Sequence, residues 1–302
     1  MNNPSVYIII LNWNGFNDTK ELLDSLRNIN QKNVKILVVD NNSSGNDVKQ
    51  LETNYKDFIQ ILKCDSNLGF AGGNNVGIKS SLDQNADFIL LLNNDTVVEK
   101  GFLEPLINKF NAEDQAGIVA PQINYFSQPK RIWSAGGKIS KVRGSGFAIS
   151  NKLDNEIPQT DRYVDFVSGC CMLIKAQVFK RVGLFDEKFF LYVEDTDLCF
   201  RVKKEGYRIF VTPQSKIFHK VNSSTKNDFS VLPLYYTTRN RLYFSKKNFP
   251  FYYYLTLLFI SLTMLFKGIL WFITGQFKNV KAVLNSFTDF FLDRMGKTGY
   301  NN

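Results

Sequence analysis

Three acidic residues stand close together in the segment FFLYVEDTDLCFRVKKEG, which covers residues 189–206. Glu194, Asp195 and Asp197 follow an aromatic, apolar run and open a pattern with the spacing of a helix. A carboxylate beside apolar residues has a raised pKa and can act as a general base near neutral pH. Acids are also typical of a first helical turn, where the helix dipole stabilises them. Glu194 and Asp197 could instead bind hydroxyl groups of a ligand; for Asp197 we favour the role at the helix start, and for Glu194 both stay open.

A second group of polar side chains ends the apolar run LLLNNDT, residues 90–96. Asn93, Asn94 and Asp95 offer two amides and one carboxylate. A hard cation such as Mg²⁺ or Mn²⁺ is typically held by one or two carboxylates plus substrate phosphates. A turn is the alternative, because Asn and Asp favour strand ends. His219, the single histidine, follows another apolar run and would suit Mn²⁺ better than Mg²⁺, although a lone histidine is more often structural.

A third polar segment, VVDNNSSG, covers residues 38–45, and its Asp40 ends another apolar run. A carboxylate at such a position can accept hydrogen bonds from a ribose or a base, and a turn is again the alternative. The glycine-rich segment NLGFAGGNNVG, residues 67–77, matches neither the dinucleotide-binding fingerprint nor the P-loop. Its glycines would let the backbone approach a ligand closely.

The elements that must position these residues alternate along the chain. Over the first 120 residues, apolar runs alternate with helical patterns, which predicts an α/β protein with a mostly parallel sheet and helices on both faces. Ligands of such sheets bind beyond the carboxyl ends of the strands, where Asn12, Asp40, Asn41 and residues 93–95 would lie. We expect strands at 5–13, 34–41, 58–64, 86–95 and 116–122, and helices at 17–29, 46–54, 72–82 and 101–110.

The second half of the chain has a less regular pattern. Residues 123–168 contain turn-rich pieces, and we expect them to be irregular. Residues 168–183 predict a strand and then a short helix, and residues 207–220 predict two short strands. An amphipathic helix is expected at residues 280–297.

Composition excludes several classes of protein. The chain has 302 residues, 44% of them hydrophobic, so it is not disordered and is long enough for one large domain or two small ones. None of its four cysteines forms a C-x-x-C pair, so neither a zinc ribbon nor a redox motif is indicated. Since no basic residue precedes the first apolar run, we expect a strand there instead of a signal peptide, and a cytoplasmic location.

The net charge of +9 is confined to the last part of the chain. Residues 1–215 carry 25 basic and 25 acidic residues, whereas residues 216–302 carry 12 basic and 3 acidic ones. The basic residues flank an uncharged stretch, residues 251–266, which indicates an anionic membrane surface more than nucleic acid as a partner. We favour helices that lie in the membrane interface; a single span and a dimer interface are the alternatives.

Taken together, these segments resemble the motifs of a known family. NWNG, VVDNNSSG, NLGFAGGNNVG, LLNNDT, the long segment from SGCCMLIK to VKKEGY, and IFHK occur in the order and spacing of family 2 glycosyltransferases. The likeness covers about residues 4–245 and is strongest to the rhamnosyltransferase-like bacterial branch. It implies a GT-A nucleotide-diphospho-sugar transferase fold over residues 1–235, followed by a basic, aromatic-rich helical tail over residues 236–302 for membrane association or dimerisation.

The resemblance also implies roles for individual residues. Asp195 corresponds to the catalytic base of the family and Asp95 to the acid that binds the metal, with Asn93 standing where the family often has Asp. His219 corresponds to a histidine that in some relatives reaches the metal or the diphosphate. The residues expected to bind nucleotide or substrate are Asn12, Asp40, Asn67, Gly69, Asn93, Asn94, Trp133, Glu194 and Arg239.

The implied activity is an inverting transfer of a sugar from a nucleotide-diphosphate sugar, with dTDP-rhamnose as first candidate, to a glycan or lipid-linked acceptor in cell-surface polysaccharide synthesis. It would use Mn²⁺ or Mg²⁺ at the inner face of the membrane, and homodimerisation is left open. A non-catalytic sugar-nucleotide-binding module of the same fold is the alternative, which the presence of Asp95 and Asp195 disfavours. A nucleotidyltransferase would carry a glycine-rich, basic loop after its first strand, and NWNGFND lacks one.

Overall fold

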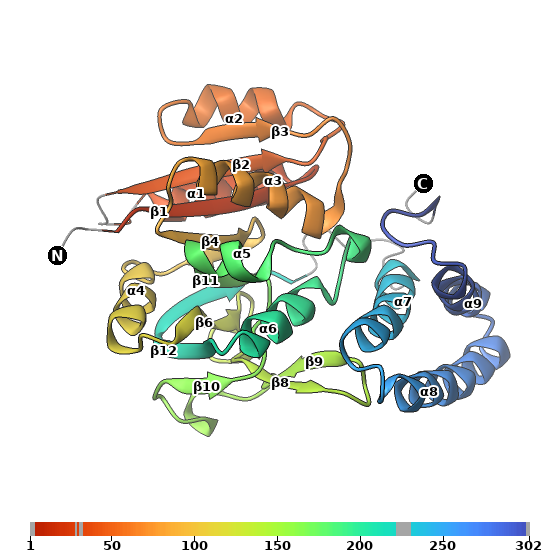
Figure 1. Ribbon diagram of the computed structural model, residues 1–302. Helices are drawn as coiled ribbons and strands as arrows, with labels where there is room; N and C mark the ends of the chain where they lie inside the picture. The colour runs from red at the N-terminus through yellow and green to blue at the C-terminus, as the bar shows by residue number, and fades with distance from the viewer. Residues whose placement is uncertain (1–3, 28, 30–32, 222–230, 300–302) are drawn as a thin grey trace.

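The computed structural model describes residues 4–27, 29, 33–221 and 231–299, and these residues contain a ten-stranded mixed sheet (Figure 1). The strands are β1 (Val6–Asn12), β2 (Val34–Asp40), β3 (Gln60–Lys63), β4 (Phe88–Asn93), β5 (Thr96–Val98), β6 (Ala116–Tyr125), β7 (Ile132–Ser134), β10 (Arg162–Val164), β11 (Cys171–Lys175) and β12 (Arg208–His219). Their order is β10-β12-β6-β11-β4-β1-β2-β3, with β5 paired to β12 and β7 to β6. β4, β1, β2 and β3 are parallel, as predicted, whereas β11 is antiparallel to both of its neighbours.

Helices cover both faces of this sheet, because its central strands are apolar on both sides. In β1, Ile8 and Ile10 pack with one core cluster, and Tyr7 and Ile9 pack with the other. Such two-sided burial is typical of parallel sheets. The helices of the first cluster are α1 (Phe16–Leu26), α2 (Asp47–Tyr55) and α4 (Leu103–Ala112); those of the second are α3 (Gly69–Asp83), α5 (Ala176–Val182) and α6 (Glu194–Lys204).

Glycines in α3 allow close packing of this helix on β1. A Cβ atom at Gly73 would lie 2.4 Å from Leu11 Cδ1, and one at Gly77 would lie 2.6 Å from Ile9 Cγ2. The expectation that the glycines of this segment admit a ligand is therefore wrong for these two positions, because strand side chains fill the space.

Residues 123–168 are not irregular, contrary to the expectation. They contain β7, β10, the short helix η1 (Asp154–Glu156), and a separate hairpin of β8 (Gly137–Ser140) and β9 (Ser145–Ala148). Strands of three or four residues are too short to show a period in the sequence. Pairing of β7 with β6 and of β10 with β12 stabilises them.

Residues 207–220 form one strand, β12, instead of the two that were predicted. β12 runs parallel to β6, and the register shifts between Thr212 and Lys216. Pro213 lies within that shift, since proline has no N–H for the ladder. The unpredicted strand β5 pairs with the end of β12 and sets Thr96 opposite His219.

Three helices form the end of the described chain, at one side of the sheet (Figure 1). They are α7 (Val231–Asn248), α8 (Tyr253–Ile273) and α9 (Phe277–Phe291). α7 joins the two parts of the molecule, because Tyr236 stacks on Phe190 and Phe244 packs with Phe189. The domain boundary predicted between residues 235 and 236 lies inside this helix.

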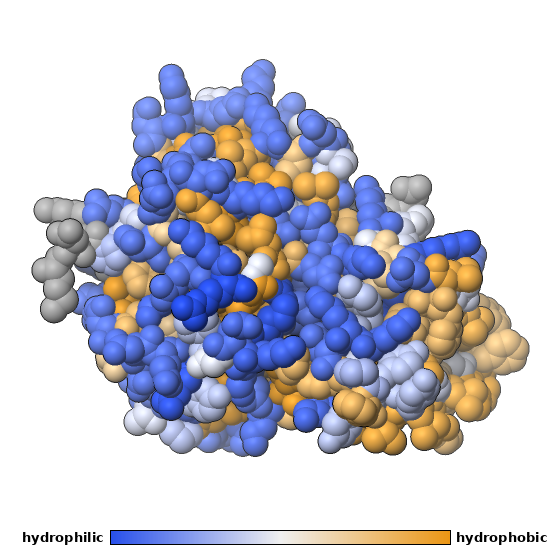
Figure 2. Space-filling view, viewed as in Figure 1, coloured by the Kyte–Doolittle hydropathy of each residue, from blue (hydrophilic) through white to orange (hydrophobic). Residues whose placement is uncertain are grey.

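One face of α8 is apolar and exposed. Among the described residues, α8 is the one helix long and apolar enough to cross a membrane, with a mean hydropathy of 2.0 over its most apolar window, 17% of which is buried. Its buried residues are Thr256, Ile260 and Met264, and the last two pack with α7 and α9. Hydrophobic side chains gather over α8 and α9 in the space-filling view (Figure 2).

Candidate active site

The carboxyl ends of three neighbouring strands bring the predicted polar residues together. In the register of the parallel sheet, Asn12 of β1 pairs with Asp40 of β2, and Leu11 pairs with Asn93 of β4. These residues therefore lie at one edge of the sheet, the edge at which α/β proteins bind ligands.

Asp40 is buried in a hydrogen-bonded network. Its Oδ1 accepts from Asn12 Nδ2 at 3.0 Å and from Ser43 Oγ at 2.6 Å, and its Oδ2 accepts from the Ser43 N–H at 3.0 Å. Asn12 also donates to Asp47 at 3.1 Å. Asp40 thus stabilises the turn after β2, the structural alternative that the sequence left open. Its role towards a nucleotide stays a prediction.

Asn94 points back toward helix α1. Its amide donates to Thr19 Oγ1 at 3.1 Å, and Thr19 in turn donates to Asn12 Oδ1 at 2.7 Å. This chain links the ends of β1 and β4, so Asn94 helps to shape the site. Thr19, Ser43 and Asp47 were not predicted, although all three lie within a few residues of Asn12 or Asp40.

Asn67 lies in the loop before α3, and Gly69 is the first residue of this helix. Asn67 Oδ1 accepts from the Gly69 N–H at 2.8 Å and from Asn41 Nδ2 at 3.1 Å. Gly69 has a φ of +71°, and a Cβ atom there would lie 2.3 Å from the carbonyl oxygen of Phe190. The Phe70 N–H donates to the same oxygen at 2.7 Å. The loop therefore lies directly against the segment that precedes Glu194.

Asp95 and His219 face each other across the β5–β12 pairing. His219 Nε2 and Asp95 Oδ2 are 3.1 Å apart. The indole ring of Trp133 lies edge-on to the imidazole, with centroids 4.4 Å apart. The remaining atoms of the pair, Asp95 Oδ1 and His219 Nδ1, are buried and have no hydrogen-bond partner. Three sequence-predicted residues thus form one cluster that leaves a carboxylate oxygen and an imidazole nitrogen unsatisfied.

Asp195 is linked to this edge of the sheet through residues 169 and 170. The Asn93 N–H donates to Cys170 O at 2.9 Å, and the adjacent Gly169 N–H donates to Asp195 Oδ2 at 3.0 Å. The Thr196 N–H donates to Asp195 Oδ1 at 2.7 Å. Residues 169 and 170, just before β11, therefore hold Asp195 of α6 near the end of β4.

Glu194 and Asp195 are both buried, and burial raises the pKa of each carboxyl group. The N–H groups of Gly169 and Thr196 oppose this rise at Asp195, because they stabilise its ionised form. Glu194 lies further above its usual pKa, because its Oε2 has no partner and Asp195 repels its charge. Burial therefore raises the pKa of Glu194 well above its usual range, whereas the hydrogen bonds hold the pKa of Asp195 lower than burial alone would place it.

The segment before α6 is strained. Phe190, Tyr192 and Val193 have φ values of 61°, 69° and 75°. This left-handed region is unfavourable for residues with a Cβ, and most of all for a β-branched one. Val193 is also the N-cap of α6, so the strain lies directly beside Glu194 and Asp195.

Helix α7 holds this strained segment in place. Asn240 Nδ2 lies 2.8 Å from each of the carbonyl oxygens of Phe189, Leu191 and Tyr192. Its two hydrogens are thus shared among three acceptors. Asn240 was not predicted, because its role depends on contacts with a segment about 50 residues earlier in the chain.

Arg239 has a different position from the one expected. Its side chain is fully buried, and its guanidinium donates to the carbonyl oxygens of Gly296 at 3.0 Å, Arg294 at 3.3 Å and Phe189 at 3.4 Å. It joins the end of the described chain to the strained segment instead of presenting its charge to a nucleotide. The predicted assignment to nucleotide binding is corrected accordingly.

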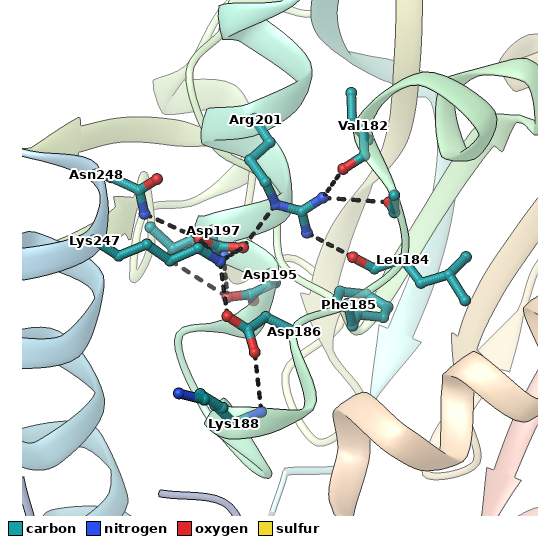
Figure 3. Close-up of polar contacts among 12 residues, drawn as sticks. Val182, Leu184, Phe185, Asp186, Lys188, Asp195, Asp197, Arg201, Lys247 and Asn248 are labelled. Atoms are coloured by element: carbon teal, nitrogen blue, oxygen red, sulfur yellow. Dashed lines mark hydrogen bonds and ion pairs between the residues drawn. The ribbon is translucent and has the colours of Figure 1, made fainter. Parts of the chain in front are cut away.

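Asp197 lies in the first turn of α6, as expected, but no side-chain hydrogen bond caps this helix. Its fully buried carboxylate accepts from Arg201 Nε at 2.8 Å, Asn248 Nδ2 at 2.9 Å and Lys247 Nζ at 3.2 Å (Figure 3). Lys247 also pairs with Asp186 at 2.8 Å. These contacts fasten α6 to the end of α7, a second link between the acidic helix and the helical tail.

Comparison with known proteins identifies the family. A model of the family described as glycosyl transferase family 2 matches residues 7–183, more than half of the chain. The chain belongs to glycosyl transferase family 2. The resemblance seen in the sequence is thereby confirmed.

Curated relatives of this family 2 member include rhamnosyltransferases. The chain is 31% identical over 205 residues to the low-salt glycan biosynthesis hexosyltransferase Agl10 of Haloferax volcanii, covering 67% of this chain and 62% of that protein, less than two thirds of its length. It is 28% identical over 236 residues to the rhamnosyltransferase WbbL of Escherichia coli, covering 74% and 87%. It is 25% identical over 230 residues to the N-acetylglucosaminyl-diphospho-decaprenol L-rhamnosyltransferase of Mycobacterium tuberculosis, covering 69% and 74%.

Solved structures show the same fold. The mannosyltransferase PcManGT of Pyrobaculum calidifontis, in complex with GDP-Man and Mn²⁺, aligns over 96% of this chain and 88% of its own, with a TM-score of 0.59 and 11% identity. GalNAc-T7 with UDP, GalNAc and Mn²⁺ aligns over 72% and 44%, with a TM-score of 0.60 and 12% identity. The fold is therefore the predicted GT-A fold.

The Asp95–His219 pair fits a divalent cation that is shared with a phosphate ligand. Among the described residues, no group of three or more His, Cys, Asp or Glu side chains forms a metal site. Asp95 Oδ1 and His219 Nδ1 are nevertheless buried without partners. Mg²⁺ and Mn²⁺ commonly take one or two protein ligands and complete their shell with phosphate oxygens and water. This donor set therefore suits a metal that arrives with a nucleotide diphosphate.

Proposed function

We propose that this family 2 member is an inverting glycosyltransferase, which moves a hexose from a nucleotide-diphosphate sugar to a hydroxyl group of a glycan or lipid-linked acceptor in polysaccharide synthesis. One observation carries the proposal: the hydrogen bonds Asn93–Cys170 and Gly169–Asp195 join a buried base to the end of β4, two residues from the unsatisfied Asp95–His219 pair. A non-catalytic module would have no need of a buried, hydrogen-bonded carboxylate beside that pair.

The residues have separate tasks in this mechanism. Asp195 accepts the proton of the acceptor hydroxyl as its oxygen attacks the anomeric carbon from the side opposite the leaving diphosphate. Such proton transfer contributes about 10²–10⁴ in rate. Asp95 and His219 would hold the cation, which would offset the charge of the leaving diphosphate. Protonated Glu194 can donate a hydrogen bond to an acceptor hydroxyl without repelling Asp195.

We propose a dTDP-linked deoxyhexose, rhamnose, as the donor sugar. Support comes from relatives with rhamnosyltransferase names, which include WbbL and the dTDP-rhamnosyl transferase RfbF of Shigella flexneri. We further propose that the enzyme acts at the inner face of a membrane, on which α8 lies. The exposed apolar face of α8 and the excess of basic residues after position 215 support this location.

Donor turnover tests the proposal. Purified protein is incubated with UDP-, dTDP- and GDP-sugars and Mn²⁺ or Mg²⁺, and release of nucleoside diphosphate is measured. We expect release from one donor, lost in Asp95→Asn and in Asp195→Asn and kept in Asp57→Asn, which changes an exposed acid far along the sheet. Metal-dependent nucleotide binding without transfer to any offered acceptor would favour the non-catalytic module, and absence of both would overturn the proposal.

A further inference from the structure

Three cations without acidic partners gather where the β8–β9 hairpin meets the helical tail. The turn of the hairpin carries Lys141 and Arg143, both exposed, and Arg241 of α7 lies against it. Among the described residues, none of the three forms an ion pair with an acid. Lys141 and Arg143 face open solvent, and cations gathered without acids produce a positive potential that attracts anions.

The cluster is rigidly built. Arg241 Nε donates to Arg143 O at 2.6 Å, and Thr256 Oγ1 of α8 donates to Lys141 O at 2.7 Å. Gly144 has a φ of +61°, and a Cβ atom there would lie 2.6 Å from Arg241 O, so only glycine lets the turn approach α7 this closely. The hairpin turn is thus fastened to both α7 and α8.

Electrostatics inside the cluster are unfavourable without a bound anion. Burial and the neighbouring Arg143 lower the pKa of Arg241 to about 10. Lys141 Nζ lies 4.9 Å from the ring of Tyr252, and Arg143 Cζ lies 5.8 Å from the ring of Phe147. Aromatic faces hold the two cations but do not neutralise them. A phosphate would, because guanidinium groups bind its oxygens in pairs.

The cluster also lies between the base and the apolar helix. On one side, the Gly146 N–H donates to Thr196 Oγ1 at 3.2 Å, which fastens β9 to the residue after Asp195. Arg143 is three residues before Gly146, or about 10 Å along an extended strand. On the other side begins the exposed face of α8, with Leu255 and Leu258 52% and 55% exposed. Figure 1 shows the hairpin turn reaching α8.

We propose that Lys141, Arg143 and Arg241 bind the phosphate or diphosphate group of a lipid-linked sugar acceptor, whose hydrocarbon chain runs along α8 and whose sugar reaches Asp195. This inference rests on the proposed function, and it names the acceptor class that this function leaves open. The exposed face of α8, the three cations and Asp195 lie in this order. The hydrocarbon chain, the phosphate and the sugar of such an acceptor follow one another in the same order.

Binding and transfer are measured separately to test it. Farnesyl diphosphate is the probe for binding, and the variant is Lys141→Gln/Arg143→Gln, which changes two exposed side chains and leaves Arg241 in place. Lys204→Gln, an exposed cation at the far end of α6, is the matched control. Since each lost charged hydrogen bond costs about 10- to 100-fold in affinity, the variant should bind at least about 10-fold more weakly and the control should not. Equal binding by variant and wild type overturns the proposal.

Two further probes identify the source of the phosphate. Inorganic diphosphate should bind more weakly than farnesyl diphosphate, since it lacks the chain that contacts α8. Vesicles of phosphatidylglycerol without any diphosphate lipid should bind the variant and the wild type within about twofold, because two charges out of the whole basic tail add little to an already multivalent contact. Equal affinity for both diphosphates, or loss of vesicle binding as large as the loss of farnesyl diphosphate binding, overturns the proposal.

Kinetics separate this proposal from the proposed function. With a lipid-diphosphate-sugar acceptor, the variant should raise the acceptor KM about 10-fold or more, whereas hydrolysis of the donor alone and transfer to a phosphate-free alkyl glycoside should stay unchanged. An equal loss with both acceptors overturns the site. If the wild type transfers nothing, the proposed function fails, and the farnesyl diphosphate binding experiment still decides whether the anion site exists.

Discussion

At the scale of single residues, the neighbouring carboxyl groups of Glu194 and Asp195 differ in their hydrogen bonds. Two backbone N–H groups donate to Asp195, whereas Glu194 Oε2 is buried without a partner. The pKa of both is raised by burial, and the charge of Asp195 raises that of Glu194 further. The surroundings therefore stabilise the ionised form of Asp195 more than that of Glu194, which suits Asp195 to accept a proton.

The pH dependence of transfer should follow Asp195. Because its pKa is raised, the ionised base is lost as the pH falls through that raised value, and kcat/KM should fall with the slope of one proton. Glu194→Gln, which imitates the protonated acid, should keep this acidic limb and most of the activity. Asp195→Asn should lose about 10²–10⁴-fold. A loss in Glu194→Gln as large as that in Asp195→Asn would reverse the two roles.

Glu194 should also make stability depend on pH. Its folded-state pKa is raised above the unfolded value, so its contribution to stability is fully present below the unfolded pKa and is lost as the pH rises through the folded one. Glu194→Gln does not ionise. The melting temperature of this variant should therefore rise relative to that of the wild type as the pH is increased, as thermal melts across pH 4–9 would show. A difference that is constant with pH would contradict a protonated Glu194.

At the scale of elements, the acidic helix α6 depends on α7 for its position. Three residues before α6 have left-handed backbones, and Asn240 of α7 donates to carbonyl groups of this segment. Asp197 adds a second link through Lys247 and Asn248. The strain is kept because the hydrogen bonds of another helix over-determine it.

Asn240→Asp should misplace the base. The substitution keeps the volume but replaces the donating NH₂ by oxygens that face three carbonyl groups, which costs about 1–3 kcal/mol per unsatisfied group. We expect kcat to fall at least about 10-fold with little change in the donor KM. Thr238→Val is the matched control in α7, because Thr238 Oγ1 is buried without a partner and nothing is lost. A lower melting temperature with unchanged kcat in Asn240→Asp would mean that Asn240 serves stability alone.

Gly69→Ala should disturb the loop before α3. The added Cβ would lie 2.3 Å from Phe190 O in a left-handed backbone, so both this loop and the segment before α6 must shift. Gly183→Ala is the control: it also has a positive φ, +77°, but nothing within 4 Å of an added Cβ, so it should cost only the conformational penalty of about 1–3 kcal/mol. We expect activity to fall far more in Gly69→Ala than in Gly183→Ala, and equal losses would contradict a role for the contact.

The same elements show what a sequence can reveal. β1, β2 and β4 were predicted because each is a long apolar run that ends in Asn or Asp, as in Asn12 and Asp40. The site residues with unpaired atoms, Asp95 and His219, were found because they end such runs. Asn240, Arg239 and Asp197 were missed or misassigned, because their roles depend on contacts between segments about 50 residues apart or more, which no local pattern shows.

At the scale of the whole molecule, the chain separates into a neutral sheet domain and a basic helical tail that α7 connects. The charge partition predicted this tail from the sequence alone, since charge and hydropathy are local quantities. The sequence did not show that α7 holds the segment before Glu194 and Asp195. It also did not show that the turn of the β8–β9 hairpin contacts α7 and α8. If the tail lies on a membrane, these contacts would therefore also set the orientation of the active site relative to that membrane.

Membrane binding should depend on the outer face of α8. Phe266 and Ile273 are 71% and 75% exposed, and burying such side chains in lipid contributes about 1.5–3 kcal/mol each, or about 10- to 100-fold in affinity. In a flotation assay, we expect the full chain to bind anionic vesicles, and to bind them more weakly at high salt. The double variant Phe266→Ser/Ile273→Ser should lose this binding. Phe126→Ser, which changes an exposed aromatic residue of the sheet domain, is the control. Concentration-dependent dimerisation without vesicle binding, abolished by the same α8 variant, would instead assign this face to a second copy of the chain.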